Sequence, residues 1–345
     1  MSACLAAAIF LVVALGPVGA AGAVEIERAH GEARFTLEDP QVSDLSGITW
    51  LGGNNFAAVS DKRKIIHLLT LSIDATTGRI TGGRIGDISN VPTKSGDFEG
   101  IAWDPAAKVF YISAEGGNSL LRFAPGAAFA PSLPLPAVFA KARPNLSLES
   151  LAWNGRARQF WIANEEALKP DGPVSSAAAG TLVRLQKLDP KFRSVAQYAW
   201  RTEPAAFRYG QAGSGVSDLC LLPDGQLLVL ERGFAGGGLH LRIFLAGFAG
   251  ATNTSRVPAL EGAEIVPATK TLLYEETTGF TNFEGLTLGP KLDGGWQSLI
   301  VVADSNGTEV HTFAALKVRW NPVAQPAGRK ALPLAVAKKK KATQP

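Results

Sequence analysis

Glutamates recur at the start of similar apolar segments along this 345-residue chain. The segments DFEGIAWDP, SLESLAWNG and NFEGLTLGP place Glu99, Glu149 and Glu284 at equivalent positions. A buried strand disfavours a carboxylate that has no partner, so each glutamate should lie at a strand end or face a positive charge. The recurrence predicts a shared site rather than three unrelated turns.

A second set of acids follows the next apolar run of each unit. Together with the three glutamates, these acids make the predicted metal-ligand set Glu99, Glu149, Glu284, Asp61, Glu115, Glu165, Glu231 and Asp304. In an antiparallel hairpin, the start of the first strand and the end of the second lie at the same end. Eight carboxylates at one rim would repel each other, and Ca²⁺ takes 6–8 oxygen ligands. The pattern therefore predicts a calcium site, with turn capping or pairing to nearby bases as the alternative for any single acid.

The acids belong to an internal repeat. The equivalent points Gly47, Gly100, Ser150, Asp218 and Gly285 are spaced by 53, 50, 68 and 67 residues. Each unit contains a hairpin followed by further alternating runs, which gives about four strands per repeat of ~50 residues, the unit of a β-propeller blade. The two longer spacings predict loop insertions at residues 166–180 and 248–267.

These features predict an all-β fold, a β-propeller with five visible repeats and five or six blades. No long stretch of 3.6-residue periodicity supports a helical fold. A β-sandwich would not explain why each unit begins with a similar hairpin. The segment EIERAHGEARFTL near the start of the chain reads as a strand that closes the ring by pairing with the last blade.

The two ends of the chain differ from its body. Residues 1–23 form an uncharged apolar segment that ends in AGA, which predicts a cleaved signal peptide and a periplasmic or secreted protein, although a basic n-region is lacking. Residues 24–320 form the predicted propeller domain. Residues 321–345 form a basic Pro/Ala/Lys tail that is expected to be disordered.

Charge and cysteine content exclude several classes. The formal net charge of +4 includes six positive charges in residues 321–345, which contain no acid, so the remaining chain carries −2. That charge favours no nucleic-acid partner. Of the two cysteines, Cys4 lies in the signal segment, and Cys220 is expected to be a buried core thiol without a disulfide. No membrane span is expected after signal cleavage, and a monomer is expected.

The motifs DFEGIAWDP, LESLAWN, WIANEE, LVLERG and NFEGLTLGP…SLIVVADSNG resemble those of the phytase-like family of secreted bacterial proteins, labelled "esterase-like activity of phytase". The resemblance covers about residues 43–306. It implies a propeller and hydrolysis of phosphoric or other esters. Propeller phytases hold several Ca²⁺ ions in an acidic channel mouth, where the ions bind phosphate and activate water. The resemblance assigns no catalytic residue in this chain.

Three functions stay open. The first is calcium-dependent hydrolysis of a phosphoric ester, with Lys62, Arg63 and Arg232 binding the substrate. The second is hydrolysis of a carboxylic ester or lactone, for which a more apolar rim with Phe98, Phe234, Phe280 and Phe283 is expected. The third is a non-enzymatic propeller of the cell envelope that binds a ligand or protein. The sequence contains no G-x-S-x-G, H-E-x-x-H or G-x-x-x-x-G-K-[ST] motif.

Overall fold

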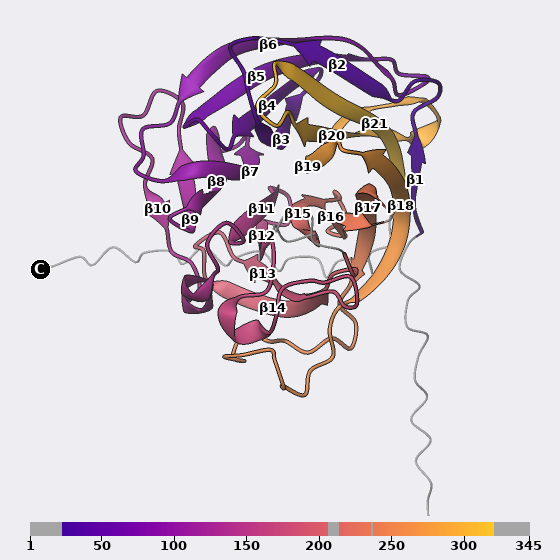
Figure 1. The fold of residues 1–345 in the computed structure, drawn as a ribbon. Coiled ribbons are helices and arrows are strands. Elements are labelled where there is room, and N and C mark those ends of the chain that lie inside the picture. Colours follow the sequence, from indigo (N-terminus) through magenta and orange to yellow (C-terminus); the bar gives the residue numbers. More distant parts are fainter. Residues whose placement is uncertain (1–22, 206–213, 236, 321–345) are drawn as a thin grey trace, which may run out of the picture. The chain divides into compact units, whose positions relative to one another are not determined.

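Twenty-one strands form five sheets in the computed structural model, which describes residues 23–205, 214–235 and 237–320 (Figure 1). Residues Val24–Arg319 make one compact unit. The first four sheets are β3(Leu45–Gly52)–β4(Asn55–Ser60)–β5(Ile65–Ile73)–β6(Ile80–Asn90), β7(Gly96–Asp104)–β8(Val109–Gly116)–β9(Ser119–Phe123)–β10(Ser132–Leu133), β11(Leu148–Asn154)–β12(Gln159–Asn164)–β13(Leu182–Leu188)–β14(Ser194–Arg201) and β15(Ser214–Leu221)–β16(Leu227–Ala235)–β17(Gly238–Gly247)–β18(Thr269–Gly279). The fifth contains β19(Asn282–Lys291), β20(Gln297–Asp304) and β21(Val310–Trp320), joined by β1(Val24–Arg28) and β2(Arg34–Glu38).

The sheets are the blades of a five-bladed β-propeller, which settles the choice between five and six blades. The first strands of the blades contact one another in the circular order β3, β7, β11, β15, β19 and back to β3. The described residues contain no α-helix, only the short 3₁₀ segments η1(Ala137–Lys141), η2(Lys169–Asp171) and η3(Asp293–Gly295). The all-β prediction is therefore confirmed.

The hydrophobic core lies between the blades. One cluster joins the last blade to the first and includes Ile48, Phe56 and Phe313, while others fill the following interfaces. Phe98 packs between the first and second blades, and Trp200 packs between the third and fourth. Both faces of most sheets are therefore covered, which explains why the inner strands are apolar at nearly every position.

Each inner strand carries a β-bulge at the same point of the repeat. The pairing register shifts between Leu45 and Ile48, and equivalent shifts occur near Phe98, Leu148, Val216 and Phe283. A bulge leaves an extra residue outside the hydrogen-bond ladder and redirects its side chain. The residues placed there are Ser46, Glu99, Glu149, Ser217 and Glu284.

The glycine after the bulge allows the inner strands to approach closely. A Cβ at Gly100 would lie 2.8 Å from the backbone N of Leu151, closer than real Cβ contacts. A side chain at this position would therefore force neighbouring blades apart. This contact explains why glycine recurs in three of the five repeats.

The N-terminal segment supplies the outer strand of the last blade. In that sheet β2 pairs antiparallel with β21, with Phe35 opposite Phe313, and β1 also neighbours β21. The strand is interrupted at residues 29–33, where the backbone N of Ala29 donates to Ala315 O at 3.1 Å and Ala315 N donates to Ala33 O at 2.7 Å. The first and last parts of the described chain thus share one sheet.

The two predicted insertions are joined by a buried ion pair. The guanidinium of Arg184, on β13, donates to both carboxylate oxygens of Asp171 at 2.6 Å, and Asp171 also accepts from Leu260 N at 2.9 Å. Asp171 lies in the first insertion and Leu260 in the second. Both loops are therefore anchored to the third blade.

Several predictions concern the ends of the chain or Cys220. The predicted signal peptide, apart from Ala23, and the predicted basic tail lie outside the described residues. No helix among the described residues is both long enough and apolar enough to cross a membrane. Cys220 is a buried free thiol, as expected, and burial raises the pKa of this thiol to about 12.

Candidate functional site

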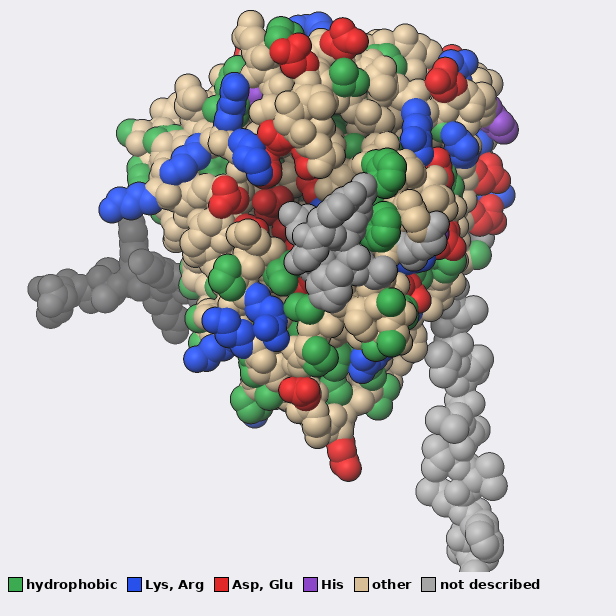
Figure 2. Space-filling view, in the orientation of Figure 1, with side chains coloured by type: hydrophobic (Ala, Val, Ile, Leu, Met, Phe, Trp, Pro, Cys, Tyr) green, Lys and Arg blue, Asp and Glu red, His purple; other side chains and the backbone are tan. Residues whose placement is uncertain are grey.

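An acidic cavity of about 710 Å³ opens where the starts of the inner strands meet the ends of the second strands. Figure 2 shows acidic side chains gathered in a hollow near the middle of one face of the molecule. The carboxylates that line this cavity are Asp61, Asp97, Glu99, Glu115, Glu149, Glu165, Glu284 and Asp304. Two basic side chains, Lys62 and Arg232, line it as well.

The bulges position the three glutamates that recur in the sequence. Glu99, Glu149 and Glu284 are 8%, 4% and 8% exposed, so each lies largely out of solvent at the base of the cavity. The equivalent residue of the first blade, Ser46, donates its hydroxyl hydrogen to Glu99 Oε2 at 2.7 Å. In the fourth blade the equivalent is Ser217, whose buried Oγ has no hydrogen-bond partner among the described residues.

The second strands bring the remaining acids to the same opening. Leu148 pairs with Asn164 in the third blade, so the next residue, Glu165, lies at the cavity. Asp61, Glu115 and Asp304 hold the corresponding position in their own blades. Seven of the eight predicted acids therefore line one cavity.

Glu231 is the exception. Val216 pairs with Glu231, so the residue that corresponds to Glu165 is the following one, Arg232. The carboxylate of Glu231 is 1% exposed and accepts hydrogen bonds from Trp200 Nε1 at 2.6 Å and Lys270 Nζ at 2.7 Å. It lies in the interface between the third and fourth blades, and its assignment to the metal-ligand set is wrong.

Arg232 is a cation built into the ring of acids. Its guanidinium forms ion pairs with Glu284, with Glu165 at 2.8 Å and with Glu149 at 3.4 Å. It also donates to Asn282 Oδ1 at 3.1 Å. All of these partners belong to the cavity wall. Arg232 therefore holds the carboxylates in place, whereas the sequence predicted that it binds substrate directly.

The other two predicted substrate-binding residues lie farther out. Lys62 pairs with Asp61, and its side chain is 65% exposed, so it stands at the rim. Arg63 is exposed, donates to Gln41 O at 2.9 Å and does not line the cavity. Of these two residues, Lys62 lines the cavity and Arg63 does not.

Burial, reinforced by neighbouring carboxylates, raises the pKa values of six of the cavity acids. Burial raises the pKa of Glu284 to about 7, against the opposing effect of Arg232, and raises that of Asp304 to about 6. The pKa values of Glu99 and Glu149 are also raised, first by burial and then by neighbouring carboxylates, and Asp61 and Glu115 follow the same direction. The cavity therefore attracts protons or other cations strongly.

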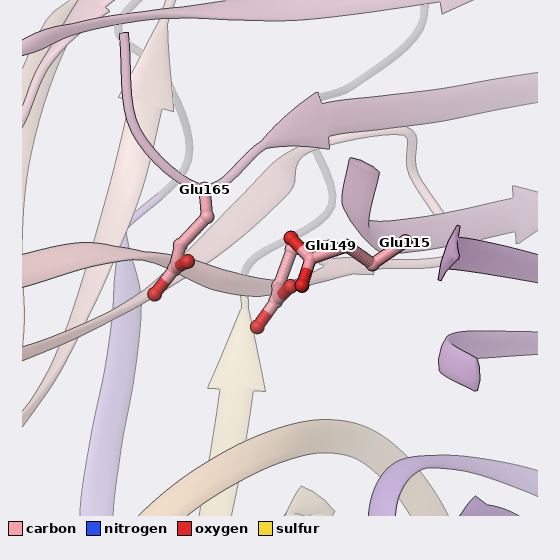
Figure 3. Close-up of side chains that lie close together, drawn as sticks. All are labelled: Glu115, Glu149 and Glu165. Carbon is pink, nitrogen blue, oxygen red and sulfur yellow. The ribbon is translucent and has the colours of Figure 1, made fainter. Parts of the chain in front are cut away.

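Three of the carboxylates come close enough to share one ion. Glu115, Glu149 and Glu165 each offer an oxygen, and these oxygens lie within 4.8 Å of one another. Figure 3 shows the three side chains close together, with Glu115 beside Glu149. Ca²⁺ binds oxygens at 2.3–2.6 Å, so oxygens across one ion are separated by up to about 5 Å. The three residues fit a calcium ion.

Two features of the cavity differ from expectation. Asp97 lines it although this residue is outside the predicted ligand set. Asp97 is the first residue of DFEG, and the equivalent first residue of NFEG, Asn282, lines the cavity too. No phenylalanine lines it among the described residues, and Phe98 and Phe283 are buried in the protein. The phenylalanines expected at the rim of a carboxylic-ester site are therefore not part of the described lining, whose apolar side chains are Pro144 and Leu146.

A match to a family model shows which family the chain belongs to. Residues 40–307 match the model of the phytase-like family described as "esterase-like activity of phytase". The chain belongs to the phytase-like family. No curated protein matches this phytase-like chain in sequence.

Solved structures similar to the phytase-like chain are remote. The PQQ-bound aldose sugar dehydrogenase of Streptomyces coelicolor aligns over 86% of this chain and 98% of its own, with 13% identity and a TM-score of 0.40. A nidogen/laminin complex aligns over 72% and 73%, with 13% identity and a TM-score of 0.35. The Cps50 (Swd1) β-propeller domain of Myceliophteria thermophila aligns over 78% and 82%, with 10% identity and a TM-score of 0.35.

Proposed function

We propose that the acidic cavity binds a divalent cation, with calcium the best match, and that the cation-loaded cavity hydrolyses an ester, a phosphoric ester first. The observation that carries this proposal is the imbalance of charge in one cavity. Among the described residues, eight carboxylates face two basic side chains, and three carboxylate oxygens lie within 4.8 Å of one another. Removing a charged group from water is costly, so such a cluster favours a counter-ion.

Glu115, Glu149 and Glu165 would hold the cation. A bound Ca²⁺ would polarise the ester oxygen and lower the pKa of a bound water molecule. The protein itself would contribute proton transfer. The carboxyl groups of Glu284 and Asp304, with pKa values of about 7 and 6, exchange protons near neutral pH, which suits a general base.

The negative charge of the cavity should make the binding of an anionic substrate depend on calcium. A phosphate dianion is repelled by uncompensated carboxylates, so its binding should depend on the cation. Lys62, exposed at the rim, can approach an anionic substrate, whereas Arg232 stays paired with the acids. A neutral carboxylic ester would suffer less repulsion, but the described cavity wall offers it no phenylalanine.

The experiment measures phosphate release from phytate and from 4-nitrophenyl phosphate between pH 5 and 9, with calcium and with a chelator. Calcium-dependent release supports the proposal. Turnover of a lactone or of 4-nitrophenyl acetate without phosphate release assigns the cavity to carboxylic esters. No turnover of any substrate, with calcium shown to raise the melting temperature, contradicts hydrolysis.

A second function rests on Arg232. Because this guanidinium already neutralises part of the cluster, the propeller face can be a stable binding surface without metal, as a non-enzymatic ligand- or protein-binding propeller of the cell envelope. An unchanged melting temperature on calcium addition favours this function. In either case we propose a periplasmic or secreted protein, on the basis of the apolar segment at residues 1–23.

A further inference from the structure

A second pocket, of about 450 Å³, lies on the other side of one wall of the acidic cavity. The wall is the tight turn at residues 143–147, in which Arg143 and Leu146 form an isolated β-bridge. Asn145 and Leu146 line the acidic cavity, Arg143 lines the second pocket, and Pro144 lines both. A molecule that crosses this turn would contact both spaces.

The second pocket has the opposite charge. In the described part of the chain, its ionisable lining residues are Arg143 and Lys169, and no acid lines it. Among the described residues, no carboxylate lies within 4.0 Å of either cation. Arg143 is fixed by hydrogen bonds from Nε to Ala167 O at 3.0 Å and from Nη2 to Gly172 O at 2.9 Å. The pocket therefore offers uncompensated positive charge at a fixed place.

The rest of the lining is apolar apart from two polar residues. Leu135, Pro136 and Phe139 form part of its wall. The side chain of Asn118 donates from Nδ2 to Phe139 O, which orients its amide. Its Oδ1 is buried and has no hydrogen-bond partner among the described residues. A buried acceptor without a partner is costly, so a ligand that supplies a donor would be favoured.

We propose that this second pocket binds an organic anion with an apolar body and a hydrogen-bond donor. The anion would face Lys169 and Arg143, the apolar body would lie along Leu135 and Phe139, and the donor would reach Asn118 Oδ1. If the proposed ester hydrolysis holds, the occupant is the part of the ester remote from the reacting bond, and this extension rests on the proposed function.

The binding test uses 4-hydroxybenzoate as the probe, measured by calorimetry on the full chain with and without calcium. Benzoate lacks the donor and 4-hydroxybenzyl alcohol lacks the anion, so each should bind about threefold more weakly. Lys169→Glu should weaken 4-hydroxybenzoate by roughly fivefold. Lys141→Glu makes the same change of charge on η1 but does not line the pocket, and it should have little effect.

Two outcomes would overturn the proposal that this pocket binds an organic anion. One is that 4-hydroxybenzoate fails to bind, or binds no better than the alcohol. The other is that Lys169→Glu and Lys141→Glu weaken binding equally, which would show only a general effect of protein charge. None of these measurements requires hydrolysis.

The link to the substrate is tested with 4-carboxyphenyl phosphate and phenyl phosphate. The first should have the lower KM in the unaltered protein. Lys169→Glu should remove that difference, whereas Lys141→Glu, which does not alter the pocket lining, should keep it. Equal KM values together with measurable binding of 4-hydroxybenzoate overturn the extension alone. Absence of hydrolysis with both substrates contradicts the proposed function, and the binding measurement then decides the pocket separately.

Discussion

The third and fourth blades have the same four-stranded order and the same bulge, yet they present opposite charges to the cavity. The third blade supplies Glu149 at the bulge and Glu165 after the second strand. The fourth blade supplies Ser217 and Arg232 at the corresponding positions. The repeat therefore fixes where a side chain points, whereas its charge is free to differ, and one changed blade provides the cation that pairs with acids from two others.

The fourth blade also differs at the residue after its bulge. Three other blades have glycine there, whereas the fourth has Asp218, which accepts hydrogen bonds from Leu219 N at 2.8 Å and from Leu286 N of the fifth blade at 2.7 Å. Burial raises the pKa of Asp218 to about 8. Its hydrogen bonds join two blades directly, so the blade that differs in charge is also tied to its neighbour by a side chain.

The largest expected effect follows from removing the difference between the two blades. Arg232→Gln leaves Glu149, Glu165 and Glu284 without their shared partner. Leaving a buried charge uncompensated costs about 3–5 kcal/mol, so the free energy of unfolding in metal-free buffer at pH 8 should fall by that amount. Urea unfolding measures the change.

Calcium should offset that loss, and the calcium-dependent rise in melting temperature should be greater for Arg232→Gln than for the unaltered protein. Lys62→Gln is the matched control because its ion pair is exposed and contributes about 0–1 kcal/mol. If the two variants unfold at the same urea concentration, Arg232 is not the organising cation.

The next effect concerns pH in the absence of metal. The folded-state pKa of Glu284, about 7, lies above the ordinary value of 4.5, so the folded state holds its proton more tightly than the unfolded chain. This contribution to stability is complete below pH 4.5 and is lost as pH rises through 7. For Glu284 alone it amounts to roughly 3 kcal/mol.

Melting in chelator should therefore occur at a lower temperature at pH 8 than at pH 5, and saturating calcium should reduce the difference, since the ion replaces the protons. A melting temperature that rises from pH 5 to pH 8 in chelator would contradict the raised pKa values. The same scan on Arg232→Gln should show a steeper decline, because the pairing that opposes the rise in pKa has been removed.

A smaller effect is expected at Glu231, the acid of the fourth blade that the sequence made look equivalent to Glu165 of the third. Glu231→Gln breaks the buried ion pair with Lys270 and should lower the free energy of unfolding by about 2 kcal/mol. Its response to calcium should equal that of the unaltered protein, because Glu231 does not line the cavity. A reduced calcium response measured by thermal melting would return Glu231 to the site.

The smallest expected change belongs to Glu149→Gln. This variant removes one member of the repelling cluster, so it should raise the free energy of unfolding by about 1 kcal/mol in chelator. It should also reduce the stabilisation by calcium, which for the parent is about 2.7 kcal/mol of unfolding free energy at a hundredfold excess of calcium over the dissociation constant. Identical melting of parent and variant, with and without calcium, would show that Glu149 belongs to no such cluster.

The repeat and its alternating apolar runs were sufficient to predict the propeller and the face on which the acids gather. They were insufficient for the fourth blade, where the second strand ends in an acid followed directly by a base, and the sequence does not reveal which of the two pairs with Val216. Choosing the acid assigned Glu231 to the cavity in place of Arg232. An error of one residue matters because neighbouring residues of a strand point to opposite sides. Glu231 points into the interface between two blades, and Arg232 points into the cavity.

The sequence also could not show which charges would meet. Arg232 was recognised as a base near the rim, but its pairing with acids of the third and fifth blades depends on a ring that brings residues 149, 165 and 284 together. The burial that raises the pKa values is likewise a property of packed blades. Asp97 could have been identified from its place beside Glu99, had the first residue of each motif been counted.

The shared sheet of β1, β2 and β21 has a consequence for the order of folding. The outer edge of β21 is completed by residues 24–38, which are synthesised some 270 positions earlier. Contacts between such distant parts of a chain form slowly, because the intervening loop must first close. Until then β21 presents an unpaired edge, which is a site for aggregation. Refolding should therefore end with a slow phase in which the ring closes, and deleting residues 24–38 should remove that phase while increasing aggregation.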